Sequence, residues 1–132
     1  MRLLLSLLLM VSPLPLLAAS QLDKLTLPKG FHIALYADHV ADAREIALGT
    51  DGTVFVGSTD AGKVYALTDG NGDGVADKVR VIASDLQLPM GVAFQHGDLY
   101  ISAVSRIVVL RDIEHHLDAP PKPEMITDKL TR

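Results

Sequence analysis

The chain has 132 residues, with 12 Lys or Arg against 16 Asp or Glu, so its formal net charge is −4. An acidic balance spread along the chain argues against a nucleic-acid-binding protein, which needs clustered basic side chains. The chain has no cysteine, so an exported domain of this kind must rely on its core, on a metal ion or on further chain.

The first twenty residues have the pattern of a secretory signal peptide. Arg2 gives a positive start, a short apolar run follows, and Ala18 and Ser20 supply the small residues of a cleavage site. The run is short for a membrane span of about 20 residues and contains two prolines. We therefore expect residues 1–20 to be removed and the product to be periplasmic or secreted, with no membrane attachment after cleavage. Residues 21–132 are long enough for one small domain.

From residue 30 onward, apolar and polar residues alternate with a period of two, which predicts strands. The stretches with this pattern are 31–36, 52–58, 63–68, 78–84, 98–104 and 106–112. Turn signals rich in Asp and Gly separate several of them. One short helical turn is expected at 112–117, because the prolines that follow forbid its continuation. The chain is therefore predicted to be all-β.

The chain also repeats itself, since residues 45–69 align with residues 91–113. The matched pairs are Ala47 with Ala93, Phe55 with Tyr100, and Leu67 with Leu110, at offsets of 46, 45 and 43 residues. A repeat of this length made of short antiparallel strands predicts about two four-stranded blades of a β-propeller. The alternative is a β-sandwich of six or seven strands whose similarity is coincidental.

Two blades do not close a propeller, which typically has 4 to 8. Each blade covers its faces with its neighbours, so two blades leave wide apolar faces uncovered. The stretch 124–132 ends where a new inner strand is expected. We interpret the chain as an N-terminal fragment or a truncated gene product.

Four stretches taken together resemble the start of the glucose/sorbosone dehydrogenase family. They are residues 27–67, the Gly/Asp-rich loop that follows, LPMGVAF at 88–94 and IEHHLDAPPKPEMI at 113–126. The resemblance covers the chain from about Leu22 to its end and depends on order and spacing rather than on one motif. It implies an exported six-bladed propeller that uses pyrroloquinoline quinone (PQQ) and calcium to oxidise aldoses or related sugars. In such an enzyme a histidine acts as general base and calcium polarises the quinone.

The catalytic histidine that this resemblance implies belongs to a stretch that would follow Arg132. The chain therefore contains no predicted catalytic residue and should not turn over sugar alone. We interpret the pair His115 and His116 as solvated surface residues of the helical turn. The other histidines are placed in turns or on a strand surface, so they supply no base and no metal trio.

Two arginines are candidates for the PQQ carboxylates, because a guanidinium group pairs with a carboxylate through two hydrogen bonds. Arg44 lies in a segment that leads into an inner strand, and Arg106 lies in a turn expected at the same end of the blades. The alternative, an ordinary surface or inter-blade arginine, is the commoner case.

The loop 69–77 is a candidate calcium site. Its possible ligands are Asp69, Asn71, Asp73, Asp77 and the Val75 carbonyl, spaced as in the first part of an EF-hand loop. Arg80 occupies the place of the bidentate glutamate and a strand follows, so the loop is not an EF-hand. Because Asp, Asn and Gly are also common turn residues, a bare acidic turn is an equal alternative. A calcium ion here would be structural.

Three functions follow from the sequence. The first is the N-terminal portion of an exported PQQ-dependent sugar dehydrogenase that is inactive alone. The second is a small exported calcium-binding module built from propeller-like repeats. The third is a non-functional gene fragment, whose uncovered faces would favour aggregation or degradation.

Overall fold

The computed structural model describes residues 21–130, which form an all-β structure with two short 3₁₀ helices. The chain divides into two units, Met1–Ile33 and Ala34–Arg132. The described part of the first unit begins with η1 (Gln21–Lys24) and continues without a strand. The predicted signal peptide lies outside the described residues. Within residues 21–130, no helix is both long and apolar enough to span a bilayer.

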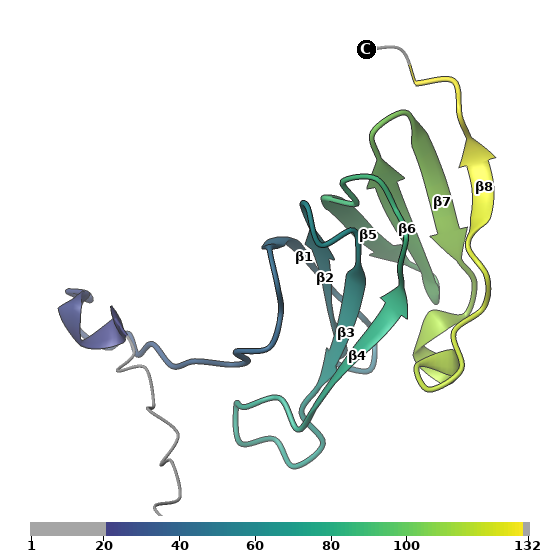
Figure 1. The fold of residues 1–132 in the computed structure, drawn as a ribbon. Coiled ribbons are helices and arrows are strands. Elements are labelled where there is room, and N and C mark those ends of the chain that lie inside the picture. Colours follow the sequence, from purple (N-terminus) through teal and green to yellow (C-terminus); the bar gives the residue numbers. More distant parts are fainter. Residues whose placement is uncertain (1–20, 131–132) are drawn as a thin grey trace, which may run out of the picture. The chain divides into compact units, whose positions relative to one another are not determined.

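The second unit consists of two four-stranded antiparallel sheets, in which each strand pairs with its neighbours in sequence (Figure 1). The first sheet contains β1 (Ala43–Leu48), β2 (Val54–Ser58), β3 (Val64–Thr68) and β4 (Lys78–Ala83). The second contains β5 (Gly91–Gln95), β6 (Asp98–Ala103), β7 (Arg106–Leu110) and β8 (Glu124–Thr127). The helix η2 (Ile113–His116) lies between β7 and β8. The predicted all-β class and the predicted helical turn are confirmed.

Local sequence explains the tight connections between these strands. The turn between β5 and β6 consists of His96 and Gly97, whose φ angles are 51° and 88°. Two consecutive positive φ angles are what a two-residue hairpin turn requires, and Gly adopts them without a steric cost. Gln95 and Asp98 are paired directly across this turn, so the turn sets the register of the hairpin.

One predicted strand is absent. Residues 31–36 form no strand, and Phe31 is 68% exposed. Alternating residues give a segment one apolar face, but a strand also needs a neighbouring strand for its backbone hydrogen bonds. Residues 124–127, for which no strand was predicted, form β8, which pairs with β7 through Val108 and Met125 and completes the second sheet.

The main core lies between the two sheets. Phe55 of β2 stacks on Phe94 of β5, with ring centroids 5.5 Å apart and an interplanar angle of 14°. The buried residues of this core are Phe55, Val64, Ala66, Ile82, Ala83, Val92, Leu99, Ile101, Val108, Leu110 and Ile113. Burial of each large side chain among them stabilises the fold by about 1.5–3 kcal/mol. The sheets therefore pack face to face into one structure.

The contact between the sheets also depends on a close approach of backbone. Gly57 of β2 lies against the carbonyl groups of Pro89 and Met90, which immediately precede β5. Next to it, the Ser58 amide donates a hydrogen bond of 3.0 Å to the Pro89 carbonyl. A side chain at Gly57 would occupy the space of these carbonyl oxygens.

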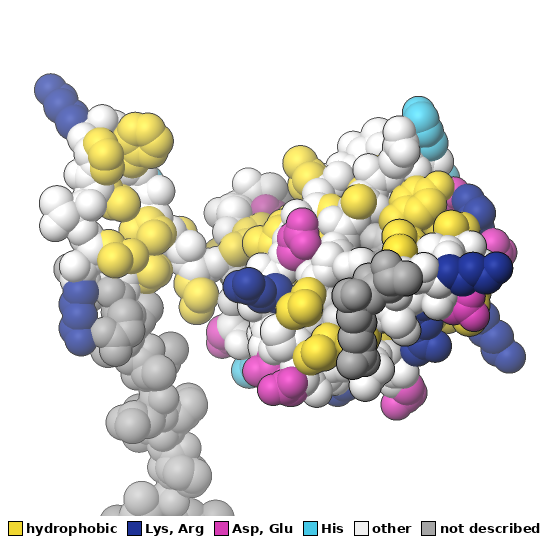
Figure 2. All heavy atoms as spheres, turned by 90° about the horizontal axis from the view of Figure 1, so that it is seen from above, with side chains coloured by type: hydrophobic (Ala, Val, Ile, Leu, Met, Phe, Trp, Pro, Cys, Tyr) yellow, Lys and Arg dark blue, Asp and Glu magenta, His cyan; other side chains and the backbone are white. Residues whose placement is uncertain are grey.

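A smaller cluster lies on the other side of the first sheet. Val56, Tyr65 and Leu67 are buried there, and Tyr36, Ala37 and Val40 pack over them. On the face shown in Figure 2, basic and acidic side chains of the second unit are interspersed with apolar ones.

Candidate functional site

The acidic loop joins β3 to β4 and projects from the end of the first sheet (Figure 1). Asp69 organises its first half. One carboxylate oxygen accepts a hydrogen bond of 2.7 Å from the Gly72 amide, and the other accepts one of 2.9 Å from the Gly74 amide. The bond from Gly74, followed by that from Gly72, lowers the pKa of Asp69. This carboxylate is therefore ionised at neutral pH.

The remaining polar side chains of the loop also hold its backbone. The Asn71 oxygen accepts a bond of 3.0 Å from the Asp73 amide, and an Asp73 oxygen accepts one of 2.9 Å from the Val75 amide. At the base, Asp77 accepts a bond of 2.6 Å from the Gly70 amide. These contacts are typical of Asx turns, so the loop is held in one conformation by its own side chains.

The donor set of the loop suits a hard cation such as calcium, which binds carboxylate, amide and carbonyl oxygens. A carboxylate oxygen that accepts one hydrogen bond retains a further lone pair. Within the part of the chain that the structure describes, however, no three His, Cys, Asp or Glu side chains come together as a metal site. The carboxylates would therefore have to turn inward to bind an ion.

The negative charge of the loop affects Tyr36, which lies in the segment that packs over the first sheet. The Tyr36 carbonyl accepts a hydrogen bond of 2.8 Å from the Ala76 amide. Burial raises the pKa of Tyr36, and the negative charges of Asp69 and Asp77 raise it further. Any cation bound in the loop would counter these two charges.

Arg80 of β4, at the place of the EF-hand glutamate, connects the first sheet to the segment between η2 and β8. Its Nε atom lies 2.6 Å from a carboxylate oxygen of Asp118, and its Nη1 atom donates a bond of 3.0 Å to the Thr68 hydroxyl. The hydrogen bond from Arg80 lowers the pKa of Asp118. Arg80 is therefore a structural link between the sheets.

The two predicted cofactor-binding arginines are not neighbours in one groove. Arg44 lies in β1 itself rather than in the preceding segment. It lines a shallow groove of about 430 Å³ together with Glu45, Met90, Gly91 and Ser102. Arg106 is the first residue of β7 and lies opposite Ala103. An anion in the groove would face the Glu45 carboxylate as well as the guanidinium group, so the groove is a weaker candidate than the loop.

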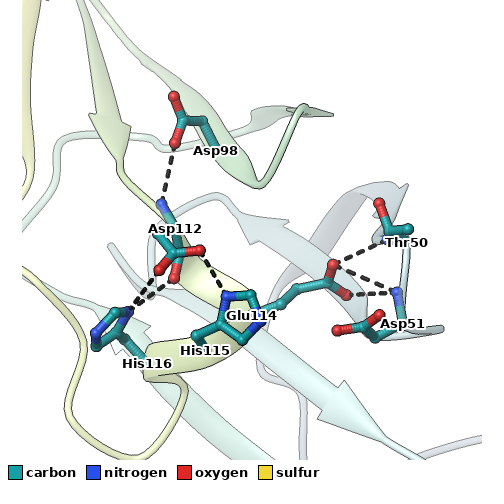
Figure 3. Close-up of polar contacts among 7 residues, drawn as sticks. All are labelled: Thr50, Asp51, Asp98, Asp112, Glu114, His115 and His116. Atoms are coloured by element: carbon teal, nitrogen blue, oxygen red, sulfur yellow. Dashed lines mark hydrogen bonds and ion pairs between the residues drawn. The ribbon is translucent and has the colours of Figure 1, made fainter.

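The histidine pair lies on the surface, as predicted, but it belongs to a polar network that the sequence analysis did not identify (Figure 3). His115 Nδ1 lies 2.6 Å from a carboxylate oxygen of Asp112, and His116 Nδ1 lies 2.8 Å from the Asp112 carbonyl. The hydrogen bond with Asp112 raises the pKa of His115. The positive φ of Asp112, 48°, positions its carboxylate beside the start of η2. These contacts are structural in kind.

Glu114 extends this network to the first sheet. Its carboxylate accepts hydrogen bonds from the backbone amides of Thr50 and Asp51, in the turn between β1 and β2. An acidic residue near the start of a short helix gave no sign of a partner so distant in sequence.

Comparison with known proteins identifies the family. The family model described as a domain of unknown function, DUF7133, matches residues 18–128. An uncharacterized protein of Borreliella burgdorferi is 26% identical over 110 residues, which are 83% of this chain and 27% of that protein. The chain thus spans about a quarter of this relative's length. No solved structure matches the chain.

This result corrects one interpretation of the sequence. The family match is to DUF7133, so the resemblance to the glucose/sorbosone dehydrogenase family is wrong. Short strands, Asp/Gly turns and their spacing recur in many repetitive β proteins and do not define one family. PQQ and a sugar substrate were implied by that resemblance alone, so they lose their basis.

Proposed function

This chain belongs to the DUF7133 family, and we propose that it is a calcium-binding module built from two blades of a β-propeller. Two observations support the propeller architecture. Each sheet is a meander of four antiparallel strands, and the second sheet packs face to face on the first through one continuous core. Consecutive four-stranded sheets arranged in this way are typical of propeller blades.

The conformation of Asp69 is the observation on which the calcium proposal rests. Its two carboxylate oxygens accept hydrogen bonds from Gly72 and Gly74, which bend the loop back over its own first residue. Asn71 and Asp73 then lie within hydrogen-bond distance of each other, 3.1 Å from Nδ2 to Oδ2. Part of the loop's ordering entropy is therefore lost before an ion arrives, which favours binding, although the carboxylates still have to turn inward.

The bound ion would stabilise the loop rather than take part in a reaction. Three aspartates in one exposed loop repel each other, and a divalent cation removes this repulsion. Arg80 connects β4 to Asp118, so a more rigid loop would also support the junction between the sheets.

Calorimetric titration of the full chain with calcium tests this function, together with thermal unfolding. We expect heat of binding and a higher Tm in calcium, because a ligand of the folded state alone stabilises it. Asp69→Asn and Asp73→Asn should abolish both effects, whereas Asp60→Asn, in the exposed turn between β2 and β3, should keep them. Magnesium should have less effect, because it needs a tighter octahedral shell. Absence of both heat and stabilisation in the unmodified chain would refute the proposal.

A further inference from the structure

The first sheet has an apolar face that points away from the second sheet. Two cross-strand rows make up this first outer face: Ile46, Val56, Tyr65 and Val81 form one, and Leu48, Val54, Leu67 and Val79 form the other. Ile46 and Leu48 are 66% and 67% exposed. The residues that alternate with these rows pack in the main core. Val56, Tyr65 and Leu67 in the middle strands are buried, so the exposed apolar residues lie on the edge strands β1 and β4. Exposed apolar residues grouped on one face in this way often mark a contact surface.

The second sheet carries the same rows, strand by strand, on the side that packs against the first sheet. They are Val92, Ile101, Val108 and Met125 in one row, and Phe94, Leu99 and Leu110 in the other. In the second sheet most of these side chains are buried in the core. The first outer face therefore has the pattern that one sheet uses to pack on a preceding sheet.

The other side of the second sheet points away from the first sheet and is called the second outer face. It consists of Ile107 and the central cross-strand row Ala93, Tyr100 and Val109. The equivalent row of the first sheet is Ala47, Phe55 and Ala66, which faces the second sheet in the core. Ala93 is exposed, Tyr100 and Ile107 are half-buried beside a shallow groove, and Val109 is buried. The first outer face thus has the residue pattern of the core-facing side of the second sheet, and the second outer face has that of the core-facing side of the first sheet.

We propose that copies of this chain associate head to tail, with the first outer face of one copy packed on the second outer face of the next. The occupant is a second copy because the residue pattern of both halves of the internal sheet-to-sheet contact recurs on the two sides of one molecule, with Ile46 and Leu48 exposed on the first outer face and Ala93 exposed on the second. Such a contact is heterologous: the two copies contribute different surfaces, and each copy retains one free face for further association. The inference concerns the sheets alone and does not depend on calcium.

Two differences make the contact between copies weaker than the contact within the chain. Arg80 pairs with Asp118 across the internal junction at 2.6 Å, but Glu124 is opposite Val109 at the equivalent place on the second outer face. In addition, Tyr36, Ala37 and Val40 pack over the middle of the first outer face, so an incoming copy has to displace them. The association is therefore expected to be reversible and to depend on protein concentration.

Sedimentation velocity of the full chain in a calcium chelator tests this proposal. The unmodified chain should form species larger than a monomer between about 10 μM and about 1 mM, the range of weak to moderate affinities. Leu48→Glu blocks the first outer face and Ala93→Glu blocks the second, both at exposed positions. Gln87→Glu, in the exposed loop before β5, adds the same charge away from both faces and should associate like the unmodified chain. Unfolding transitions equal to that of the unmodified chain establish that each variant is folded. Val81→Glu is a second variant that blocks the first outer face.

The mixture of the two blocked variants gives the decisive result. Each variant alone should be monomeric, but an equimolar mixture should form dimers and nothing larger, because each partner retains the face that the other has lost. A monomer at every concentration of the unmodified chain overturns the proposal. So does a mixture that stays monomeric, because a contact between identical faces is not restored by mixing. Since calcium is absent, these outcomes are independent of whether the loop binds an ion.

Discussion

Glu114 of η2 binds the backbone of Asp51 across the junction between the two sheets. The Asp51 amide lies 3.1 Å from one carboxylate oxygen of Glu114 and 3.3 Å from the other, and the Thr50 amide lies 3.0 Å from the second oxygen (Figure 3). Both amides belong to a tight turn, in which the Gly52 amide donates to the Gly49 carbonyl. One side chain of η2 thus accepts hydrogen bonds from two backbone amides of the turn between β1 and β2.

Removal of this carboxylate should weaken the junction. We expect Glu114→Ala to lower the free energy of unfolding by about 1 kcal/mol, because the turn amides are exposed and water replaces part of the lost hydrogen bonding. Urea denaturation measures the change. Glu45→Ala removes an exposed carboxylate from β1 and should have a smaller effect. Equal losses in both variants would show that the contact across the junction contributes nothing.

The stacked pair Phe55 and Phe94 should contribute more than any polar contact at the junction. Phe55 is fully buried, so Phe55→Ala should lower the free energy of unfolding by about 3–5 kcal/mol through lost burial and a residual cavity. Phe31→Ala makes the same chemical change at a residue that is 68% exposed, and it should leave stability nearly unchanged. Chemical denaturation of both variants provides the comparison, and similar costs would contradict a core between the sheets.

Gly57 should tolerate no side chain. A Cβ atom there would lie 2.6 Å from the Pro89 carbonyl oxygen and would also overlap the Met90 carbonyl. Because backbone must move to relieve this contact, Gly57→Ala should cost about 1–3 kcal/mol. At Gly70 the nearest atom to an added Cβ is an Asp77 oxygen at 3.4 Å, an ordinary contact. Gly70→Ala is therefore the control, and thermal unfolding in calcium-free buffer should separate the two variants.

His115 should titrate above the ordinary histidine value of about 6.5. The hydrogen bond with Asp112 raises its pKa in the folded state, so the stabilisation is fully present below the unfolded-state pKa. It is lost as the pH rises through the folded-state pKa. NMR titration of the imidazole ring measures the value directly. Asp112→Asn should move it back toward the ordinary value, and an unchanged titration would show that the contact is absent in solution.

The strands could be predicted because their signal is local. Val54–Ser58 and Val64–Thr68 are short runs rich in β-branched and aromatic residues and are bounded by Asp/Gly turns, so composition and turn chemistry agree. Residues 31–36 alternate in polarity as a strand would but form none, because a sequence pattern cannot show whether a partner strand is present. For the same reason β8, which follows three prolines, was not predicted as a strand; its place in the second sheet depends on β7.

In the candidate site, too, contacts between residues close in the sequence could be predicted, whereas contacts between distant residues could not. The turn around Asp69 could be predicted, since its hydrogen-bond partners lie within five residues. The partner of Arg80 is 38 positions away, and that of Glu114 is 64 positions away. An exposed acidic residue and an arginine in a strand are common on any protein surface, so the sequence gives no sign of their partners. Only the packing of the sheets reveals what they bind.

The meander topology has a consequence for the order of folding. Every strand pairs only with its neighbours in sequence, so each sheet closes short loops, and the entropy lost on closing a loop grows with its length. Either sheet can therefore form before the two dock. The bond from Thr50 to Glu114 spans 64 positions and needs both sheets in place. We expect it to form after the docking of the sheets, which makes this pair a reporter of the last stage of folding.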